Sequence, residues 1–449
     1  MKLKPYSAMK DSGIEWIGKI PEHWQTPSVS KIYDIQLGKM LQPKPESNDE
    51  KLVPYLKADN VHWERIEIND LNEMWANSLE ITKYGLKNGD LLVCEGGEGG
   101  RSAIYFGKIQ NCIIQNALHR VRGLNGFDVK YLMYVLIYCN YIKWLDAINN
   151  KATIAHFTKE KFSSLHIPLS FVVNEQKQII SFLDEEISKV DSEISINQKL
   201  IEIIKVKRQS IINQAVTKGL DPTVPMKDSG IERIGRMPEQ WQVNKIKFTS
   251  YVKGRIGWQG LRSEEFTDFG SFLITGTDFE DGRINWNSCH HVENWRYEQD
   301  QYIQIKEKDI LITKDGTIGK VAYIDKVPDK TTLNSGVMVI RPINNNFEPT
   351  YLFWLLKSNQ FIDFIEMIKS GSTIQHLYQE TFENFKFTLP RTLGEQKSIS
   401  KFLDKKINQT DGMLYMISCQ IGKLQEFRQS LISSAVTGKI DLRNYPISA

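Results

Sequence analysis

The glycine-rich stretch CEGGEGGR, at positions 94–101, has the composition of a loop that could bind a phosphate. Such stretches hold phosphates when they open a helix, because the helix N-terminus then supplies backbone N–H groups. Here the stretch joins two apparent strands, LLVC and SAIY, which disfavours a nucleotide site. The alternative is a hairpin turn in which the glycines supply positive φ.

No other pattern in the chain predicts a catalytic centre. There is no GxxxxGK[ST] loop, no HExxH, no Gly-x-Ser-x-Gly, and no Asp/Asn-Pro-Pro-aromatic tetrapeptide of the kind that holds a target adenine in amino-methyltransferases. Apart from His290–His291 the eight histidines stand singly, and the five cysteines form no CxxC pair. We therefore predict no catalytic residue, no metal site and no cofactor, and a reducing cytoplasmic location.

Length and charge limit the remaining classes. A chain of 449 residues exceeds one ordinary core, so two or more domains are expected. The net charge of +3 is nearly balanced, so a nucleic-acid surface would have to be a local patch. No run approaches eighteen apolar residues and no signal core opens the chain, so no membrane segment is predicted.

The chain repeats itself. MKDSGIEWIGKIPEHWQ at 9–25 returns as MKDSGIERIGRMPEQWQ at 226–242. EQKQIISFLDEEI (175–187) returns as EQKSISKFLDKKI (395–407), and RQSIINQAVTKGLD (208–221) as RQSLISSAVTGKID (428–441). One unit of about 220 residues is therefore written twice. The middle part of each unit differs in sequence and retains only a similar pattern of expected elements. Short strands such as GDLLVCEG, RSAIYFG and DILITKDG, followed by helices near 128–146 and 348–368, indicate an α+β domain.

Each unit ends in a long helix. No proline occurs between positions 175 and 217 or between 395 and 437, and apolar residues recur every three or four positions. That spacing is typical of a coiled-coil seam, and about 43 residues make a helix of about 65 Å. The apolar seam positions are Ile179, Leu183, Ile187, Val190, Ile194, Ile201, Ile204, Ile211 and Ala215 in the first helix, and Ile399, Leu403, Ile407, Leu414, Ile421, Leu424, Leu431 and Ala435 in the second. Asn197, Arg208 and Arg428 on the seam are interpreted as residues that fix its register or form hydrogen bonds, rather than as contacts to DNA.

The predicted fold class is α+β, with two similar domains joined by two long antiparallel coiled-coil helices in a pseudo-two-fold repeat. The boundaries are 1–172 for the first domain with its repeat segment 9–25, and 173–218 for the first helix. The second domain covers 219–392 with its repeat segment 226–242, and 393–449 holds the second helix and the tail.

Further apolar residues lie off the seam, at matching positions in both helices. An exposed stripe of this kind usually marks a docking site, which we predict here. The alternative is that the globular parts of the same chain cover it. The stripe consists of Phe182, Ile196, Ile212, Val216, Phe402, Met416, Ile432 and Val436.

These repeated segments, in this order, resemble the specificity subunit of a type I restriction–modification system over essentially the whole chain. The resemblance implies that each variable middle is a target recognition domain reading one half of a bipartite double-stranded DNA site. It also implies that the helices pair antiparallel as a spacer and dock two modification (methyltransferase) subunits, with endonuclease/translocase subunits joining for cleavage. Methyl transfer and ATP-driven translocation would then belong to the partners, in agreement with the missing motifs.

The pattern of divergence supports a reading function. Two domains about an approximate two-fold axis can face two half-sites about 34 Å apart on DNA. The middles differ where loops are expected: GKMLQPKPE (38–46) stands where GRIGWQGLRSE (254–264) stands, and CEGGEGGR where TKDGTIGK stands. Different side chains on a shared framework predict an asymmetric site.

Base edges and phosphates require donors and cations on loops. On that basis the predicted DNA-binding residues are Lys39, Gln42, Lys44, Lys57, Asn60, Arg101, Thr153 and His156 in the first domain, and Arg255, Trp258, Gln259, Arg262, Lys314, Lys320, Thr373, Gln375 and His376 in the second. Any one of them could instead be a solvated surface residue, and Thr153 or Ser372 could cap a helix.

Three function classes stay open: a non-catalytic DNA-reading subunit, an enzyme with fused catalysis, and a coiled-coil scaffold. The sequence favours the first. It does not give the recognised bases, the spacer length, the oligomeric state of the isolated chain or the presence of an active endonuclease partner.

Overall fold

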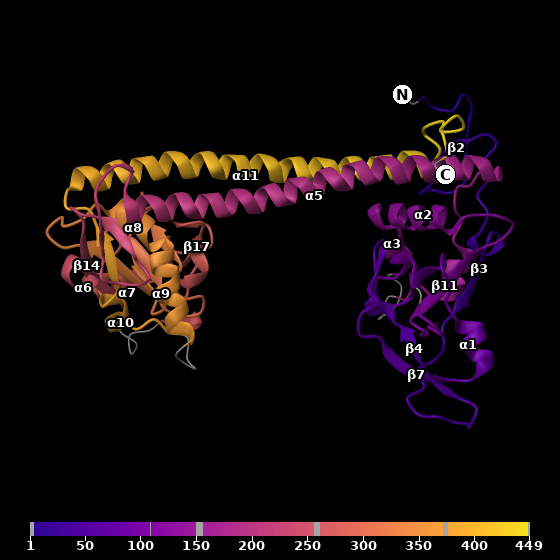
Figure 1. Cartoon of the computed structure of the whole chain (residues 1–449), viewed down its shortest axis with the longest axis horizontal. Helices are drawn as coiled ribbons and strands as arrows, with labels where there is room; N and C mark the ends of the chain where they lie inside the picture. Colours follow the sequence, from indigo (N-terminus) through magenta and orange to yellow (C-terminus); the bar gives the residue numbers. More distant parts are fainter. Residues whose placement is uncertain (1–3, 108, 150–155, 256–260, 371–375, 448–449) are drawn as a thin grey trace. The chain divides into compact units, whose positions relative to one another are not determined.

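The computed structural model describes residues 4–107, 109–149, 156–255, 261–370 and 376–447 (Figure 1). The chain divides into two units. Unit 1 comprises Met1–Asn197 with Cys419–Ala449, and unit 2 comprises Gln198–Ser418. Each unit therefore contains a segment of each long helix.

The two long helices are α5 (Val173–Lys218) and α11 (Leu393–Val436), of 46 and 44 residues. Neither contains a proline, and glycines with positive φ follow them: Gly219 (φ 75°) directly after α5, and Gly438 (φ 67°) two residues after α11. A glycine is favoured there because only glycine adopts that backbone conformation without strain.

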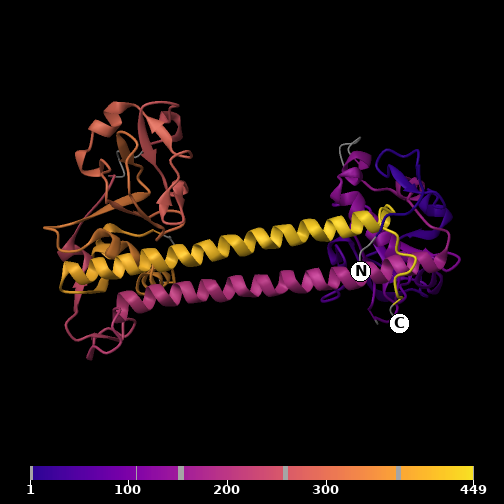
Figure 2. The ribbon, with the colours of Figure 1, turned by 90° about the horizontal axis from the view of Figure 1, so that it is seen from above.

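In unit 1 the α5 segment is antiparallel to the α11 segment (Figure 2). Gln178 contacts Arg443 beyond the end of α11, whereas Asp191, further along α5, contacts Arg428 within α11. Apolar seam residues of both helices enter one core, among them Ile179, Ile187, Ile432 and Ala435. Burying them is the main stabilising term for this pairing.

In unit 2 the same contacts are made, but α5 supplies the residues that α11 supplies in unit 1, and the reverse. Arg208 of α5 contacts Asp411 of α11, and the carbonyl of Val216 accepts a hydrogen bond from Thr388, just before α11 begins. Ile212 and Ala215 share a core with Ile399, Leu403 and Ile407. The predicted α+β class, with two long antiparallel helices and an internal repeat, is confirmed.

Each unit has a helix packed between the long helices and a sheet. In unit 1 this is α2 (Val129–Tyr141), which begins where the Asp128 carboxylate accepts from the Lys130 amide. Leu132 and Leu136 of α2 share the core with Val93 of the sheet and Leu183 of α5. In unit 2, α8 (Pro349–Leu356) lies at the equivalent position, between the long helices and the sheet.

The predicted helices at 128–146 and 348–368 are each present as two shorter helices, α2 with α3 (Trp144–Asn149) and α8 with α9 (Asn359–Ser370). Lys143, which lies between α2 and α3, has a φ of 60°, and this backbone conformation ends the first helix before the second begins.

Unit 1 has a four-stranded antiparallel sheet of order β3-β11-β8-β9 and a three-stranded sheet of order β10-β4-β7. Its strands and remaining helices are β1 (Met9–Asp11), β2 (Lys19–Pro21), β3 (Tyr33–Leu37), β4 (Lys51–Leu56), β5 (Val61–His62), β6 (Arg65–Ile66), β7 (Asn72–Ala76), β8 (Leu91–Cys94), β9 (Ser102–Ile104), β10 (Ile113–Ile114), β11 (Leu118–Gly123), α1 (Ser78–Tyr84) and α4 (Lys159–Ser164).

Unit 2 has the equivalent sheets, of order β15-β23-β20-β21 and β19-β16-β22. Its elements are β12 (Met226–Asp228), β13 (Arg236–Pro238), β14 (Gln242–Lys245), β15 (Ser250–Gly254), β16 (Ser271–Ile274), β17 (Phe279–Glu280), β18 (Arg283–Ile284), β19 (His290–Val292), β20 (Ile310–Thr313), β21 (Val321–Tyr323), β22 (Thr331–Leu333), β23 (Val337–Pro342), β24 (Lys386–Leu389), α6 (Ile246–Thr249), α7 (Asn294–Glu298) and α10 (Gln379–Glu383).

The repeated segment that opens each half of the sequence has a structural role. It forms the hairpin β1–β2 in unit 1 and the hairpin β12–β13 in unit 2, and a buried tryptophan follows each hairpin. Trp24 Nε1 donates to Oε1 of Glu175 at 3.1 Å, and Trp241 Nε1 donates to Oε1 of Glu395 at 2.8 Å. Each bond ties its segment to the first turn of a long helix.

Candidate DNA-reading surfaces and helix contacts

The glycine-rich stretch is the turn of the β8–β9 hairpin, as the sequence predicted. The strands pair antiparallel, and Cys94 N donates to Arg101 O at 2.8 Å. Gly100 has φ 92°, and a Cβ on it would lie 2.6 Å from Leu145, so no other residue fits without a shift. The loop opens no helix, so it has none of the geometry of a phosphate loop.

The β20–β21 hairpin of unit 2 is built in the same way. Thr313 N donates to Lys320 O at 3.0 Å, and Gly319, at φ 84°, lies over Ile365 as Gly100 lies over Leu145. The loops 95–101 and 314–320 are therefore equivalent, although their side chains differ.

Backbone hydrogen bonds join the hairpin loop of unit 1 to neighbouring loops. Glu95 N donates to Ala117 O at 2.9 Å, and Glu95 O accepts from Phe157 N at 2.7 Å. Asn116 N donates to Lys39 O at 2.8 Å. We call the loops at 38–46, 57–60, 95–101, 115–117 and 156–157 reading surface 1.

In unit 2, Lys314 N donates to Gly336 O at 2.8 Å, and Lys314 O accepts from Leu377 N at 2.9 Å. His376 Nδ1 contacts the carboxylate of Asp315, the residue that follows Lys314. We call the loops at 275–278, 314–320, 334–336 and 376–377 reading surface 2. The two backbone hydrogen bonds of Lys314 in this surface are equivalent to the two backbone hydrogen bonds of Glu95 in reading surface 1.

Two residues predicted to touch DNA from the first domain are buried. Lys39 Nζ donates to Gln42 Oε1 at 2.7 Å and contacts Glu80, while Gln42 Nε2 donates to Glu50 Oε2 at 2.9 Å. Their polar atoms hold the loop 38–46 against α1, so these two side chains are not exposed as expected, and their contact with DNA stays a prediction. They position the loop because burial requires every donor to be satisfied.

The other described residues predicted for unit 1 lie on reading surface 1. Lys44 and His156 are exposed, and Lys57 Nζ lies 3.1 Å from Asp59. Asn60 Oδ1 accepts from Lys57 N at 3.0 Å. Arg101 Nη2 donates to the Ala58 carbonyl at 2.9 Å, so it fastens the hairpin loop to the loop at 57–60.

In unit 2 Arg255 is buried, with Nε donating to Leu333 O at 2.7 Å and Nη2 to Thr332 Oγ1 at 3.0 Å. Arg255, like Lys39, is therefore not exposed as expected, and its contact with DNA stays a prediction. Arg262 is exposed, and Lys314 and Lys320 are half-buried on the hairpin loop. Thr153, Trp258, Gln259, Thr373 and Gln375, together with the helix-capping alternative for Thr153 and Ser372, lie outside the described residues.

The predicted apolar stripe divides into two groups. Ile196 and Met416, at equivalent positions, are each 64% exposed, and Phe402 is exposed as well. Its other members are buried against residues of their own unit, so the expectation of an exposed docking face was wrong for them: Phe182, Ile212, Val216, Ile432 and Val436. Phe182, for example, packs edge-on against Tyr445, with ring centroids 5.2 Å apart.

The polar seam residues form ion pairs between the helices. Arg208 Nε lies 2.8 Å from Asp411 Oδ1 in unit 2, and Arg428 Nε lies 2.9 Å from Asp191 Oδ1 in unit 1. These contacts confirm the interpretation of both arginines as hydrogen-bonding residues of the seam, whereas their effect on its register stays a prediction.

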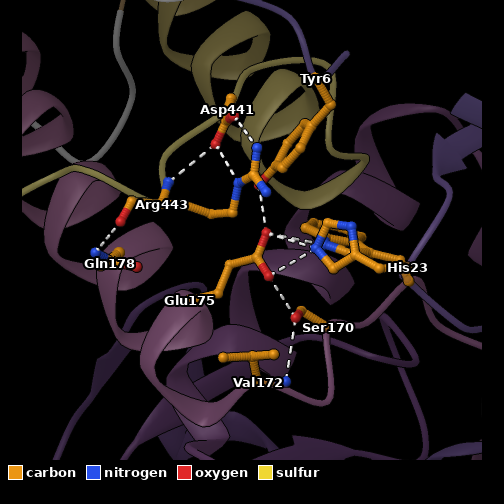
Figure 3. Close-up of polar contacts among 9 residues, drawn as sticks. Tyr6, His23, Ser170, Val172, Glu175, Gln178, Asp441 and Arg443 are labelled. Carbon is orange, nitrogen blue, oxygen red and sulfur yellow. Dashed lines mark hydrogen bonds and ion pairs between the residues drawn. The ribbon is translucent and has the colours of Figure 1, made fainter. Parts of the chain in front are cut away.

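A buried carboxylate cluster in unit 1 was missed by the sequence analysis. The Glu175 side chain, 2% exposed, accepts from Tyr6 OH at 2.5 Å, Ser170 Oγ at 2.5 Å and Trp24 Nε1 at 3.1 Å, and His23 Nε2 lies 2.9 Å away (Figure 3). Burial raises the pKa of Glu175, but the hydrogen bonds more than offset it and hold that pKa below its usual value.

The tail of the chain completes this cluster. The Arg443 guanidinium lies 5.2 Å from the Tyr6 ring, and its Nη2 donates to Asp441 Oδ2 at 2.6 Å (Figure 3). Hydrogen bonds to the Asp441 carboxylate, together with the nearby negative charge of Glu175, raise the pKa of Arg443. No local sequence signal could reveal the cluster, because its members come from three distant segments of the chain, residues 6–24, 170–175 and 441–443.

Within the described residues, no three histidine, cysteine, aspartate or glutamate side chains converge as metal ligands do. The helices in the described part of the chain include none with the length and apolarity needed to cross a membrane.

Comparison with known proteins fits this architecture. The family model for the type I restriction modification DNA specificity domain matches residues 21–205 and 258–413. A putative type I restriction enzyme MjaX specificity subunit of Methanocaldococcus jannaschii is 24% identical over 437 residues, covering 95% of this chain and 96% of that protein. The EcoDI specificity subunit of Escherichia coli is 20% identical, covering 94% and 90%.

Solved structures share the fold. A chain from a study of complex assembly and conformational transition of the type I R-M system superposes with a TM-score of 0.71 at 14% identity, covering 93% of this chain and 98% of that one. The HsdS subunit of Thermoanaerobacter tengcongensis gives a TM-score of 0.53 at 14% identity, covering 94% and 98%. The chain belongs to the family of type I restriction–modification specificity subunits.

Proposed function

We propose that this chain reads an asymmetric, bipartite double-stranded DNA site, with one domain for each half-site, and performs no catalysis itself. The observation that carries the proposal is the pair of equivalent reading surfaces. Their backbones are held by the same hydrogen bonds, whereas their side chains differ in charge and shape. A shared framework with different donors and acceptors is suited to reading two different base sequences.

The long helices dock the modification (methyltransferase) subunits, which supply the methyl-transfer chemistry in the cytoplasm. Ile196 and Met416 support this, because the same exposed apolar position occurs once in each helix repeat, as two identical partners require. Endonuclease/translocase subunits join the same complex for cleavage.

The test is methylation mapping of a host that expresses this chain with its modification subunit. We expect methylated adenines in both halves of one asymmetric interrupted motif. Purified chain alone should transfer no methyl group and hydrolyse no ATP. Turnover by the chain alone would favour fused catalysis, and methylation without sequence preference would favour a scaffold.

A duplicated chain tests the assignment of one domain to each half-site. A chain carrying residues 1–225 twice has Arg208 and Asp191 in both copies, so it can form both interhelical ion pairs. With two identical domains it should direct methylation to an inverted repeat of the first half-site. A motif that still contains the second half-site would refute the proposal.

A further inference from the structure

Glu95 and Lys314 occupy the same position in the two hairpins but carry opposite charge. Each is the first residue after a buried strand, β8 or β20. The amide of each donates to a loop carbonyl, Ala117 or Gly336, and the carbonyl of each accepts from the amide of Phe157 or Leu377. The backbone is thus fixed on both sides, so each side chain starts from the same place.

The Glu95 carboxylate is left without a donor in the described part of the chain. Its side chain is 19% exposed, and Oε2 makes no hydrogen bond there. Nε2 of buried His119 lies 3.7 Å away but already bonds the Phe157 carbonyl at 3.0 Å. Burial raises the pKa of Glu95, and the charge of His156 only partly offsets that effect. Burial lowers the pKa of His119 and so keeps its ring neutral near pH 7. A partly buried carboxylate with unused acceptor capacity is costly unless a ligand supplies the donor.

Lys314 meets the opposite environment. Met338 pairs with Ile312 in unit 2 as His119 pairs with Val93 in unit 1, so a thioether replaces the imidazole. Lys314 Nζ lies 3.6 Å from the position that a Cβ on Gly254 would take, and no carboxylate within the described residues pairs with it. The acidic residue of this loop, Asp315, is engaged by His376. The ammonium donors are therefore free of carboxylates.

Resting on the DNA-reading function proposed above, we propose that Glu95 and Lys314 are base-reading residues of opposite chemistry. Glu95 accepts a hydrogen bond from the exocyclic amino group of a cytosine or an adenine in one half-site. Lys314 donates to the O6 and N7 acceptors of a guanine in the other half-site. These are the base edges that carboxylates and ammonium groups recognise in the major groove.

The experiment uses the full chain expressed with its modification subunit in a host free of other adenine methylation, with motifs mapped for Glu95→Lys, Glu95→Gln and Lys314→Glu. In Glu95→Lys, the base recognised at one position of one half-site should change from a cytosine or an adenine to a guanine. Glu95→Gln should relax the choice there by about 10- to 100-fold, because an amide both donates and accepts. Lys314→Glu should alter only the other half-site. Glu73→Gln, an exposed charge removal on β7, is the matched control and should leave the motif unchanged.

An unaltered motif in Glu95→Lys would overturn the assignment, and so would changes spread over both half-sites. If Glu95→Lys abolishes methylation, binding of the purified complex to duplexes varied at each position of the half-site decides: equal weakening on every duplex overturns the proposal. If the wild-type complex methylates no defined motif, the DNA-reading function itself fails, which is a different result.

Discussion

Arg208 and Asp411 join the two long helices, with Nε 2.8 Å from Oδ1, and their repeat equivalents Arg428 and Asp191 form the same pair at 2.9 Å. One contact therefore recurs in both units. Arg428 also binds Glu64 at 2.6 Å, and its side chain is less exposed than that of Arg208.

The two arginines should differ in their contribution to stability. Arg208→Ala should lower the free energy of unfolding by about 1 kcal/mol, and Arg428→Ala by about 2 kcal/mol, because the latter leaves two carboxylates without a partner. Denaturant unfolding measures both. Arg208→Asp combined with Asp411→Arg should recover most of the loss, whereas a double variant no better than Arg208→Asp would show that the pair does not bind across the seam.

The Glu175 cluster should make unit 1 sensitive to acid. Glu175→Gln places an amide against donors from Tyr6, Ser170 and Trp24, so we expect a loss of about 3 kcal/mol at pH 7. Because the folded pKa of Glu175 is lowered, its contribution is present above the unfolded value of about 4.3 and is lost as the pH falls through the folded value. The difference from wild type should therefore close below about pH 4 in thermal unfolding.

Glu395→Gln is the matched control, since Glu395 is half-buried and bonds Trp241. It should cost about 1 kcal/mol. An equal loss in both variants would mean that the extra donors around Glu175 contribute nothing.

Cysteine labelling should report partner docking on α11. Cys419 is exposed, whereas Cys94, Cys112, Cys139 and Cys289 are buried and burial raises the pKa of all four thiols. An alkylating reagent should therefore modify Cys419 first in the native chain. Bound modification subunit should slow that reaction about tenfold or more, measured by mass spectrometry. An unchanged rate would place the partner elsewhere.

The two hairpin cations should act differently on DNA. Lys320 has no carboxylate partner in the described part of the chain, so Lys320→Ala should weaken binding to all sequences alike and reduce the salt slope by about one. Arg101 holds the loop at 57–60 through Ala58, so Arg101→Ala should relax discrimination by about 1–3 kcal/mol at its own half-site. Binding assays across salt concentrations separate the two effects. Exposed Lys326→Ala serves as the control, and wild-type behaviour in both variants would remove the hairpins from the interface.

The sequence predicts the long helices well because their signal is local and repeated. The four- and three-residue spacing of Leu183, Ile187 and Val190 needs no knowledge of distant residues, and these side chains are buried as predicted. The hairpin at 94–101 was recognisable for the same reason, since glycine spacing reflects local backbone geometry.

Burial by distant segments could not be predicted. Phe182 is covered by Tyr445, 263 positions away, so its pattern on the helix does not distinguish a docking surface from an internal contact. Lys39 and Arg255 show the same limit for polar residues: residue type indicates a possible DNA contact, but Glu80 and the Leu333 carbonyl already engage them.

Both ends of the chain belong to unit 1, where the amide of Asp441 donates to the carbonyl of Lys4 at 2.8 Å, whereas unit 2 is one uninterrupted stretch. A ribosome therefore releases all of unit 2 before the residues that complete the core of unit 1, such as Ile432 and Val436. During that delay, on the order of ten to forty seconds, the first half carries uncovered apolar side chains. A messenger RNA truncated after the codon for Ser418 would yield a chain that exposes this surface to chaperones and proteases. Such an incomplete subunit should therefore be degraded before it can direct methylation of DNA.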